Sequence, residues 1–117
     1  MSPLATEIYK HLLKHLRANQ ASITYGELAD AVSARIPTHP RSRTLHAALG
    51  ELTQACRAAG LPCLPAMVWR HDRKRPSDGY YKLAHSRSRS DLARIAAWER
   101  EHARVLVETP KFPAVLP

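Results

Sequence analysis

Residues 23–29 read Ile23-Thr24-Tyr25-Gly26-Glu27-Leu28-Ala29, and this stretch decides the fold that the sequence predicts. Thr24 and Glu27 stand three residues apart, so each side chain can accept a hydrogen bond from a backbone N–H group that a helix start leaves exposed. This capping box predicts a short helix over residues 25–34, with Leu28 and Val32 facing inward. Tyr25 is then the first residue of that helix.

Two longer helices are expected on either side of it. Before it, apolar residues recur every four positions: Leu4, Ile8, Leu12 and Leu16. This spacing predicts an amphipathic helix over residues 4–17 that ends at Asn19-Gln20. After it, a loop with two prolines at residues 35–40 precedes a third helix, which begins near Ser42 or Arg43. One face of that helix is apolar, with Leu45, Leu49, Leu52 and Cys56. Gly60 is expected to cap its C-terminus.

The pattern changes after Pro62. Residues 64–69 are short and apolar, and residues 80–83 follow a polar stretch with two tyrosines, so we expect a β-hairpin. The connection at residues 71–79 holds three consecutive cations, and Asp78-Gly79 can adopt the positive φ that turns the chain back. Three helices followed by a hairpin with a basic tip is the layout of a winged helix. The predicted fold class is therefore α+β and mostly helical.

A further helix is expected at the C-terminal side. Residues 86–90 alternate serine and arginine and are predicted to be a basic linker, and Ser90 can cap a helix over residues 91–107. Its apolar positions Ile95, Trp98 and Val105 can pack back on the body, with Trp98 against the first helix. The prolines beyond residue 109 predict an extended tail. We therefore expect a winged-helix domain over residues 1–85, with residues 86–117 packing on the same domain.

Charge gives the strongest indication of a partner. The 117 residues contain 18 lysines and arginines against 10 acids, a net charge of +8. The excess lies in residues 35–89, because the segments before and after are balanced. A cationic surface made by one contiguous segment is typical of a module that binds a nucleic acid, and duplex DNA is the expected partner.

Several other classes of protein are disfavoured. No apolar run approaches the roughly 20 residues that a bilayer span requires, and the N-terminus lacks the features of a signal peptide, so we expect a cytoplasmic protein without membrane contact. The cysteines Cys56 and Cys63 are interpreted as small core side chains. No glycine-rich phosphate loop, hydrolytic triad or convincing metal-ligand spacing is present, so the sequence predicts neither an enzyme nor a cofactor or metal site.

Three segments carry a resemblance to a known family: residues 23–29, residues 43–49 (Arg-Thr-Leu-His-Ala-Ala-Leu) and residues 60–65 (Gly-Leu-Pro-Cys-Leu-Pro). They resemble the DNA-binding domain of the alkylguanine-DNA alkyltransferases and the alkyltransferase-like proteins, over roughly residues 3–83. The resemblance implies that Tyr25 lies beside the DNA backbone and helps rotate a damaged nucleotide out of the stack. It also implies that Arg43, at the start of the recognition helix, fills the vacated space.

The chain departs from this family at the reactive position. Where the family has Pro-Cys-His-Arg, with the cysteine accepting the alkyl group, this chain reads Pro65-Ala66-Met67-Val68. Alkyl transfer needs an activated thiolate, which Ala66 does not supply. Cys63 lies three residues early and has no histidine after it. The resemblance therefore extends to the DNA-binding scaffold and not to the repair reaction.

The sequence thus predicts a non-catalytic winged-helix protein that contacts duplex DNA mainly through the backbone. The groove side is expected to use Tyr25, Arg41, Ser42, Arg43, Thr44 and His46. The wing is expected to use Arg70, Arg73, Lys74 and Arg75. Two alternatives stay open. One is a protein-interaction module that regulates or inhibits a nucleic-acid enzyme, or forms a homodimer, through the C-terminal helix; the other is an alkyltransferase-like protein that recognises a lesion.

Overall fold

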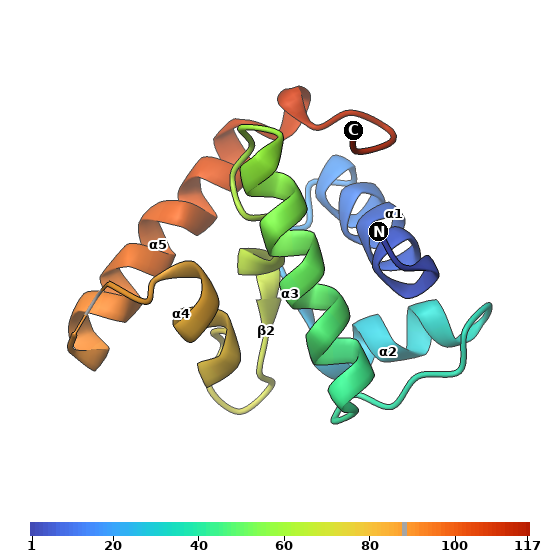
Figure 1. The fold of residues 1–117 in the computed structure, drawn as a ribbon, viewed down its shortest axis with the longest axis horizontal. Coiled ribbons are helices and arrows are strands. Elements are labelled where there is room, and N and C mark those ends of the chain that lie inside the picture. Colours follow the sequence, from blue (N-terminus) through green and yellow to red (C-terminus); the bar gives the residue numbers. More distant parts are fainter. Residues whose placement is uncertain (88) are drawn as a thin grey trace.

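The computed structural model describes residues 1–87 and 89–117, which form a mostly helical fold with a small parallel sheet (Figure 1). Its elements are α1 (Pro3–Arg17), β1 (Ile23–Thr24), α2 (Tyr25–Ser33), α3 (Arg43–Ala58), the 3-10 helix η1 (Leu64–Met67), β2 (Val68–Trp69), α4 (Asp78–Ala84), α5 (Asp91–Val107) and the 3-10 helix η2 (Thr109–Lys111). Among the described residues, no helix is long and apolar enough to span a membrane. The predicted linker covers residues 86–90, of which Ser88 lies outside the described residues.

The first three helices confirm the prediction to within about two residues at each end. Asn19, with a φ of 62°, follows the end of α1. Thr24 and Glu27 form the predicted capping box, in which each side chain accepts a hydrogen bond of 3.1 Å from the other residue's backbone N–H. Gly60 has a φ of 71° and follows the end of α3, as expected of a glycine at a helix C-terminus.

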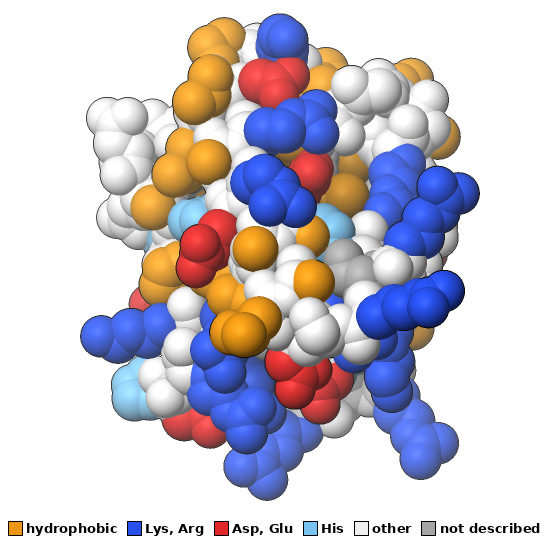
Figure 2. Space-filling view, turned by 90° about the vertical axis from the view of Figure 1, so that its left-hand side faces the viewer, with side chains coloured by type: hydrophobic (Ala, Val, Ile, Leu, Met, Phe, Trp, Pro, Cys, Tyr) orange, Lys and Arg blue, Asp and Glu red, His pale blue; other side chains and the backbone are white. Residues whose placement is uncertain are grey.

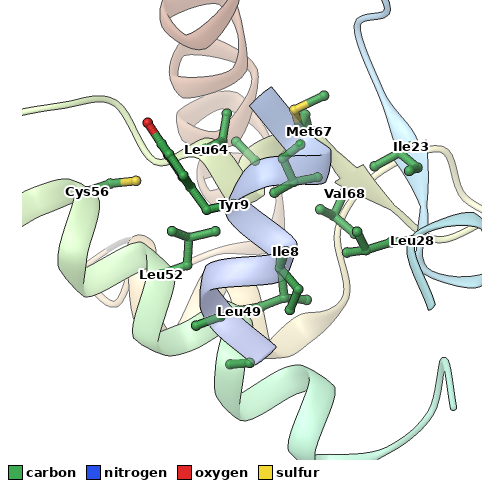
Figure 3. Packing of buried hydrophobic residues seen from close by; sticks show 14 of the residues in the cluster. Ile8, Tyr9, Ile23, Leu28, Leu49, Leu52, Cys56, Leu64, Met67 and Val68 are labelled. Atoms are coloured by element: carbon green, nitrogen blue, oxygen red, sulfur yellow. The ribbon is translucent and has the colours of Figure 1, made fainter. Parts of the chain in front are cut away.

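The core lies between α1, α3 and the segment of η1 and β2. Figure 3 shows Ile8 and Tyr9 of α1 close to side chains of the other elements, among them Leu49 and Leu52 of α3, Leu64 and Met67 of η1 and Val68 of β2. All of η1 is buried, so the apolar run after Pro62 lies at the centre of the fold.

The predicted β-hairpin between residues 64–69 and 80–83 is wrong. Residues 64–67 form η1, and Val68 and Trp69 pair in parallel with Ile23 and Thr24 of β1. The run at residues 80–83 belongs to α4. Tyr81 and Ala84 are both buried, and residues three apart lie on one face of a helix. Burial of that face explains why residues 80–83 are helical and not extended.

The chain therefore reverses earlier than predicted, in a tight loop over residues 70–75 that we call the basic loop. The Arg70 N–H donates a hydrogen bond of 2.8 Å to the Arg75 carbonyl oxygen, and Lys74 adopts a φ of 54°. Asp78 and Gly79, predicted to turn the chain with positive φ, are instead the first two residues of α4. The Arg57 guanidinium of α3 donates to the carbonyl oxygens of Leu83 and Ala84 and so holds the end of α4.

The C-terminal helix begins as predicted, with Ser90 Oγ accepting a hydrogen bond of 3.1 Å from the Ala93 N–H. Trp98 is buried, as predicted, and its indole N–H donates a hydrogen bond to the Ala66 carbonyl oxygen of η1. The tail after η2 packs on α1. Phe112 and Leu116 are buried, and the Tyr9 hydroxyl donates to the Pro113 carbonyl oxygen. One cluster of buried side chains thus contains residues from α1 through the tail.

Candidate nucleic-acid interface

Tyr25 joins three segments of the chain at one end of the fold. The capping box holds the start of α2, where Tyr25 is the first residue. The Ser77 N–H donates a hydrogen bond of 3.0 Å to the Tyr25 hydroxyl, whose oxygen also lies 3.1 Å from Ser77 Oγ. The Tyr25 ring lies 5.3 Å from the His46 ring, at an angle of 38°. Tyr25 therefore links the starts of α2 and α4 and the first turns of α3.

An open hollow of about 620 Å³ lies beside Tyr25. Four of the predicted site residues line it: Tyr25, Arg41, His46 and Arg70. His71 and Ser77 also line it and were not predicted. Ser77 precedes Asp78, the first residue of α4, so recognition of that helix from the sequence would have marked Ser77 as a candidate. The starts of α2 and α3 and the basic loop meet at this hollow, at the lower end of the fold in Figure 1.

Arg70 and Asp72 form an ion pair within the basic loop. The Arg70 guanidinium donates two hydrogen bonds to the Asp72 carboxylate, of 3.0 Å from Nε and 2.8 Å from Nη2. These bonds hold the pKa of Asp72 below its ordinary value and raise the pKa of Arg70. Asp72 therefore offsets much of the charge that Arg70 brings to the hollow. Because Asp72 is exposed and Arg70 is partly exposed, the pair contributes little to stability.

The other cations of the basic loop differ from Arg70. Among the described residues, no carboxylate lies within ion-pair distance of Arg73, Lys74 or Arg75. Lys74 and Arg73 are exposed, and Arg75 is partly buried. Arg73 and Arg75 do not line the hollow beside Tyr25 but a separate pocket nearer to α5. The predicted wing residues thus divide between two sites.

The predicted residues at the start of α3 also divide. Ser42 Oγ accepts a hydrogen bond of 3.0 Å from the Leu45 N–H and so caps the helix. Ser42 and Thr44 lie on another hollow of about 540 Å³, between α3 and the start of α1, and not on the hollow beside Tyr25. Arg43 is exposed and lines neither hollow. One turn of helix therefore presents its side chains to two different faces.

Behind the hollow lies a smaller cavity of about 90 Å³, lined among others by Tyr25, Thr53, Pro65 and Tyr80. Ala66, next in the chain to Pro65, is fully buried.

The Cys63 N–H donates a hydrogen bond of 2.8 Å to Glu101 Oε1, and burial of the Cys63 thiol raises its pKa to about 11. Cys63 therefore remains a protonated, buried thiol at neutral pH.

The described side chains around the hollow present hydrogen-bond donors and positive charge. Among the described residues, no group of three or more histidine, cysteine, aspartate or glutamate side chains is placed to hold a metal ion. No family model, curated protein or solved structure matches the chain. What the site can do follows from its own geometry, which offers an aromatic ring, helix starts and guanidinium groups around an open hollow.

Proposed function

We propose that this chain binds duplex DNA without catalysing a reaction, through the end of the fold that holds the starts of α2 and α3 and the basic loop. The observation that carries the proposal is the hollow beside Tyr25, because it gathers Tyr25, Arg41, His46 and Arg70 from separate segments. Helix starts and guanidinium groups around an open surface favour a phosphate backbone as the partner.

In this proposal α1, α2 and α3 act as a winged-helix scaffold, and the basic loop takes the place of the hairpin wing. The first turn of α3 presents Arg43 and His46 to the groove, and both are exposed. Lys74, at the tip of the basic loop, lies on the flanking backbone. Tyr25 lies between these two contacts, in the position that the resemblance to the alkyltransferase scaffold implies.

Fluorescence anisotropy of a labelled duplex at several salt concentrations tests the proposal. Each phosphate contact contributes about 0.9 to the slope of log affinity against log salt concentration. An Arg41→Ala/Arg43→Ala double variant is expected to bind more weakly and to lower this slope by up to about 2. Lys14→Ala is the matched control, because Lys14 is an exposed cation on α1 beside Arg17 and the tail. It should leave the slope unchanged.

Two results would contradict the proposal. One is a parent protein whose affinity for duplex DNA does not depend on salt. The other is a double variant that binds with the affinity and slope of the parent. An RNA duplex of the same sequence is the control for nucleic-acid type, since the wide groove that admits a helix in B-form DNA is narrow and deep in A-form RNA. We expect the RNA duplex to bind more weakly.

The cavity behind Tyr25 favours a narrower version, in which the protein recognises an alkylated base. That cavity measures about 90 Å³, and Tyr25 and Pro65 are among the residues that line it. A flipped base would need a pocket at this place, and the alkyl substituent would enter it. Titration of two duplexes that differ only in one O6-alkylated guanine distinguishes recognition of an alkylated base from plain duplex binding. Equal affinities would leave plain duplex binding and exclude lesion recognition.

A second candidate function is protein contact through α5. Leu92 and Val107 of that helix are 81% and 80% exposed, and Leu106 is 38% exposed. Figure 2 shows the face over α4 and α5, where hydrophobic side chains lie between groups of lysine and arginine. A salt-insensitive dimer in size-exclusion chromatography that a Leu92→Ser/Val107→Ser variant abolishes would favour this function. A monomeric parent protein would exclude the homodimer.

A further inference from the structure

A small polar pocket of about 100 Å³ lies between the basic loop and the starts of α4 and α5. The basic loop contributes Arg73 and Arg75, and α5 contributes Arg94. Tyr81 of α4 also lines the pocket. In Figure 2, lysine and arginine side chains stand on both sides of acidic side chains at the lower end of this face. This pocket is separate from the hollow beside Tyr25.

Tyr81 has a hydroxyl that the fold leaves without a partner. Only 6% of the residue is exposed, and its oxygen has no hydrogen-bond partner among the described residues. Its neighbour Tyr80 differs, because the oxygen of its hydroxyl lies 3.0 Å from His85 Nε2. Burial of a hydroxyl without a hydrogen bond is unfavourable and calls for an explanation. A ligand in the pocket would supply the missing partner.

The charges around Tyr81 indicate which ligand that is. Arg75 and Asp78, which line the same pocket, are among the charges that act on the Tyr81 hydroxyl. Asp78 and Asp91 are the first residues of α4 and α5. The carboxylate of Asp91 interacts favourably with the partial positive charge at the N-terminal end of α5. The three guanidinium groups exceed the two carboxylates by one positive charge. Guanidinium groups match the oxygens of a phosphate in shape and in donors.

We propose that this pocket binds one phosphate group, which accepts hydrogen bonds from the guanidinium groups of Arg73, Arg75 and Arg94 and from the hydroxyl of Tyr81. The pocket is small, about 100 Å³ against about 620 Å³ for the hollow beside Tyr25, which is consistent with a ligand as small as one phosphate group. Burial raises the pKa of Tyr81, so its hydroxyl keeps its proton at neutral pH and can donate.

Two sources share this chemistry: a phosphate of a nucleic-acid strand, and free phosphate or a small phosphate ester. Only the first source rests on the proposed function. The basic loop contributes to both sites, since Arg70 lines the hollow beside Tyr25 while Arg73 and Arg75 line the pocket. A strand that crosses the hollow could therefore reach the pocket with its backbone.

Thermal unfolding of the full chain in millimolar inorganic phosphate tests the proposal, with sodium chloride holding the ionic strength constant. A ligand that binds the folded state raises the midpoint of unfolding. Tyr81→Phe removes only the hydroxyl oxygen, so this variant is expected to be as stable as the parent without phosphate. It should need at least about tenfold more phosphate for the same increase, since a hydrogen bond to a charged group is lost. Arg75→Gln should weaken the response in the same way.

Tyr80→Phe is the matched control. It removes the hydroxyl that contacts His85, so it should lower stability while keeping the full response to phosphate. The proposal is overturned if phosphate stabilises the parent and Tyr81→Phe equally, if it stabilises neither, or if Mg²⁺ stabilises the parent where phosphate does not. The first of these results would mean a general salt effect and not a site.

A duplex titration then separates the two sources. If a strand phosphate occupies the pocket, Tyr81→Phe weakens duplex binding and inorganic phosphate competes with the duplex. If the source is free phosphate, duplex affinity is unchanged while the response to phosphate is lost. Failure of the proposed function can be distinguished from failure of the phosphate site. If only DNA binding is wrong, the parent would not bind the duplex. Phosphate would still stabilise the parent, and Tyr81→Phe would still reduce that stabilisation.

Discussion

The indole Nε1–H of Trp98 donates a hydrogen bond of 2.8 Å to the backbone carbonyl oxygen of Ala66. This bond joins α5 to η1, which is the buried centre of the fold. The Trp98 ring also contacts Trp69 edge to face, with ring centroids 5.9 Å apart, and stacks on His102 at 5.8 Å. Through these contacts the C-terminal helix completes the core and is not a separate appendage.

Trp98→Ala is therefore expected to lower the free energy of unfolding by about 3–5 kcal/mol, as a buried aromatic side chain would. Trp98→Phe keeps most of the packing but leaves the Ala66 carbonyl oxygen unpaired, and should cost about 1–3 kcal/mol. Urea denaturation followed by circular dichroism measures both. Leu92→Ala is the control on the same helix, because Leu92 is 81% exposed and should change stability by less than about 0.5 kcal/mol. A stable Trp98→Ala variant would contradict the core role.

A pair of glycine substitutions tests the backbone conformation at two turns. Gly60 has a φ of 71°, so Gly60→Ala should lower the free energy of unfolding by about 1–2 kcal/mol although nothing lies near the added Cβ. Gly79 lies in the first turn of α4, and its added Cβ also meets nothing within 4 Å. Gly79→Ala should leave stability unchanged or raise it by up to about 1 kcal/mol. Equal effects of the two substitutions would show that α4 does not begin at Asp78.

Comparison of the predicted with the observed elements shows which parts of the fold the sequence could predict. Helices α1, α2 and α3 were predicted because their signals are local: a capping box at Thr24, apolar residues four apart, and Gly60 at a helix end. The parallel pairing of Ile23 with Val68 was missed because it joins strands of two residues each that are far apart in the chain. The α4 helix was missed because its short run of two tyrosines and a leucine also fits a strand, and only the burial of Tyr81 and Ala84 decides between them.

In the candidate site, too, some residues could be predicted from the sequence and others depend on the three-dimensional fold. Residue type and position predicted Tyr25, Arg41, His46 and Arg70, which the fold brings to one hollow. Ser77 was missed because its contact with Tyr25 depends on the unpredicted α4. The ion pair between Arg70 and Asp72 was also missed, since two residues that are two positions apart face each other only once the tight turn of the basic loop is known.

The ion pair between Arg70 and Asp72 predicts that removal of one charged side chain strengthens duplex binding. Asp72→Asn should leave Arg70 unpaired beside the hollow, so duplex affinity should rise and the salt slope should increase by up to about 0.9. Glu108→Gln is the control, because Glu108 pairs with Arg104 and Lys111 near the C-terminal end of α5, at the opposite end of the fold from the basic loop in Figure 1. Anisotropy titrations of both variants measure the effect. Weaker binding by Asp72→Asn would mean that the pair itself contacts the DNA.

Stability in alkaline solution should depend on Cys63. Burial raises the pKa of this thiol from 9.0 in model compounds to about 11, so the unfolded chain releases the proton at lower pH than the folded chain. The stability that this shift contributes is complete below pH 9 and is lost as the pH rises towards 11. The free energy of unfolding should fall by up to about 1.4 kcal/mol per pH unit for this group. Denaturation curves of the parent and Cys63→Ala between these values measure it, and the variant should show the shallower fall.

The same burial bears on repair chemistry, because alkyl transfer needs a thiolate that can reach an extruded base. Ala66 occupies the position that the resemblance assigns to the acceptor; it is fully buried, and its carbonyl oxygen accepts the hydrogen bond from Trp98. Cys56 and Cys63 are also buried, with thiol pKa values raised by that burial. Incubation with a duplex that carries O6-methylguanine should therefore leave the mass of the intact protein unchanged. A thiol-specific alkylating reagent is the control: it should label both cysteines in urea and label the folded protein far more slowly. A mass increase of one methyl group after incubation with the duplex, located to either cysteine by peptide mapping, would contradict a purely binding role and place this chain among proteins that accept the alkyl group.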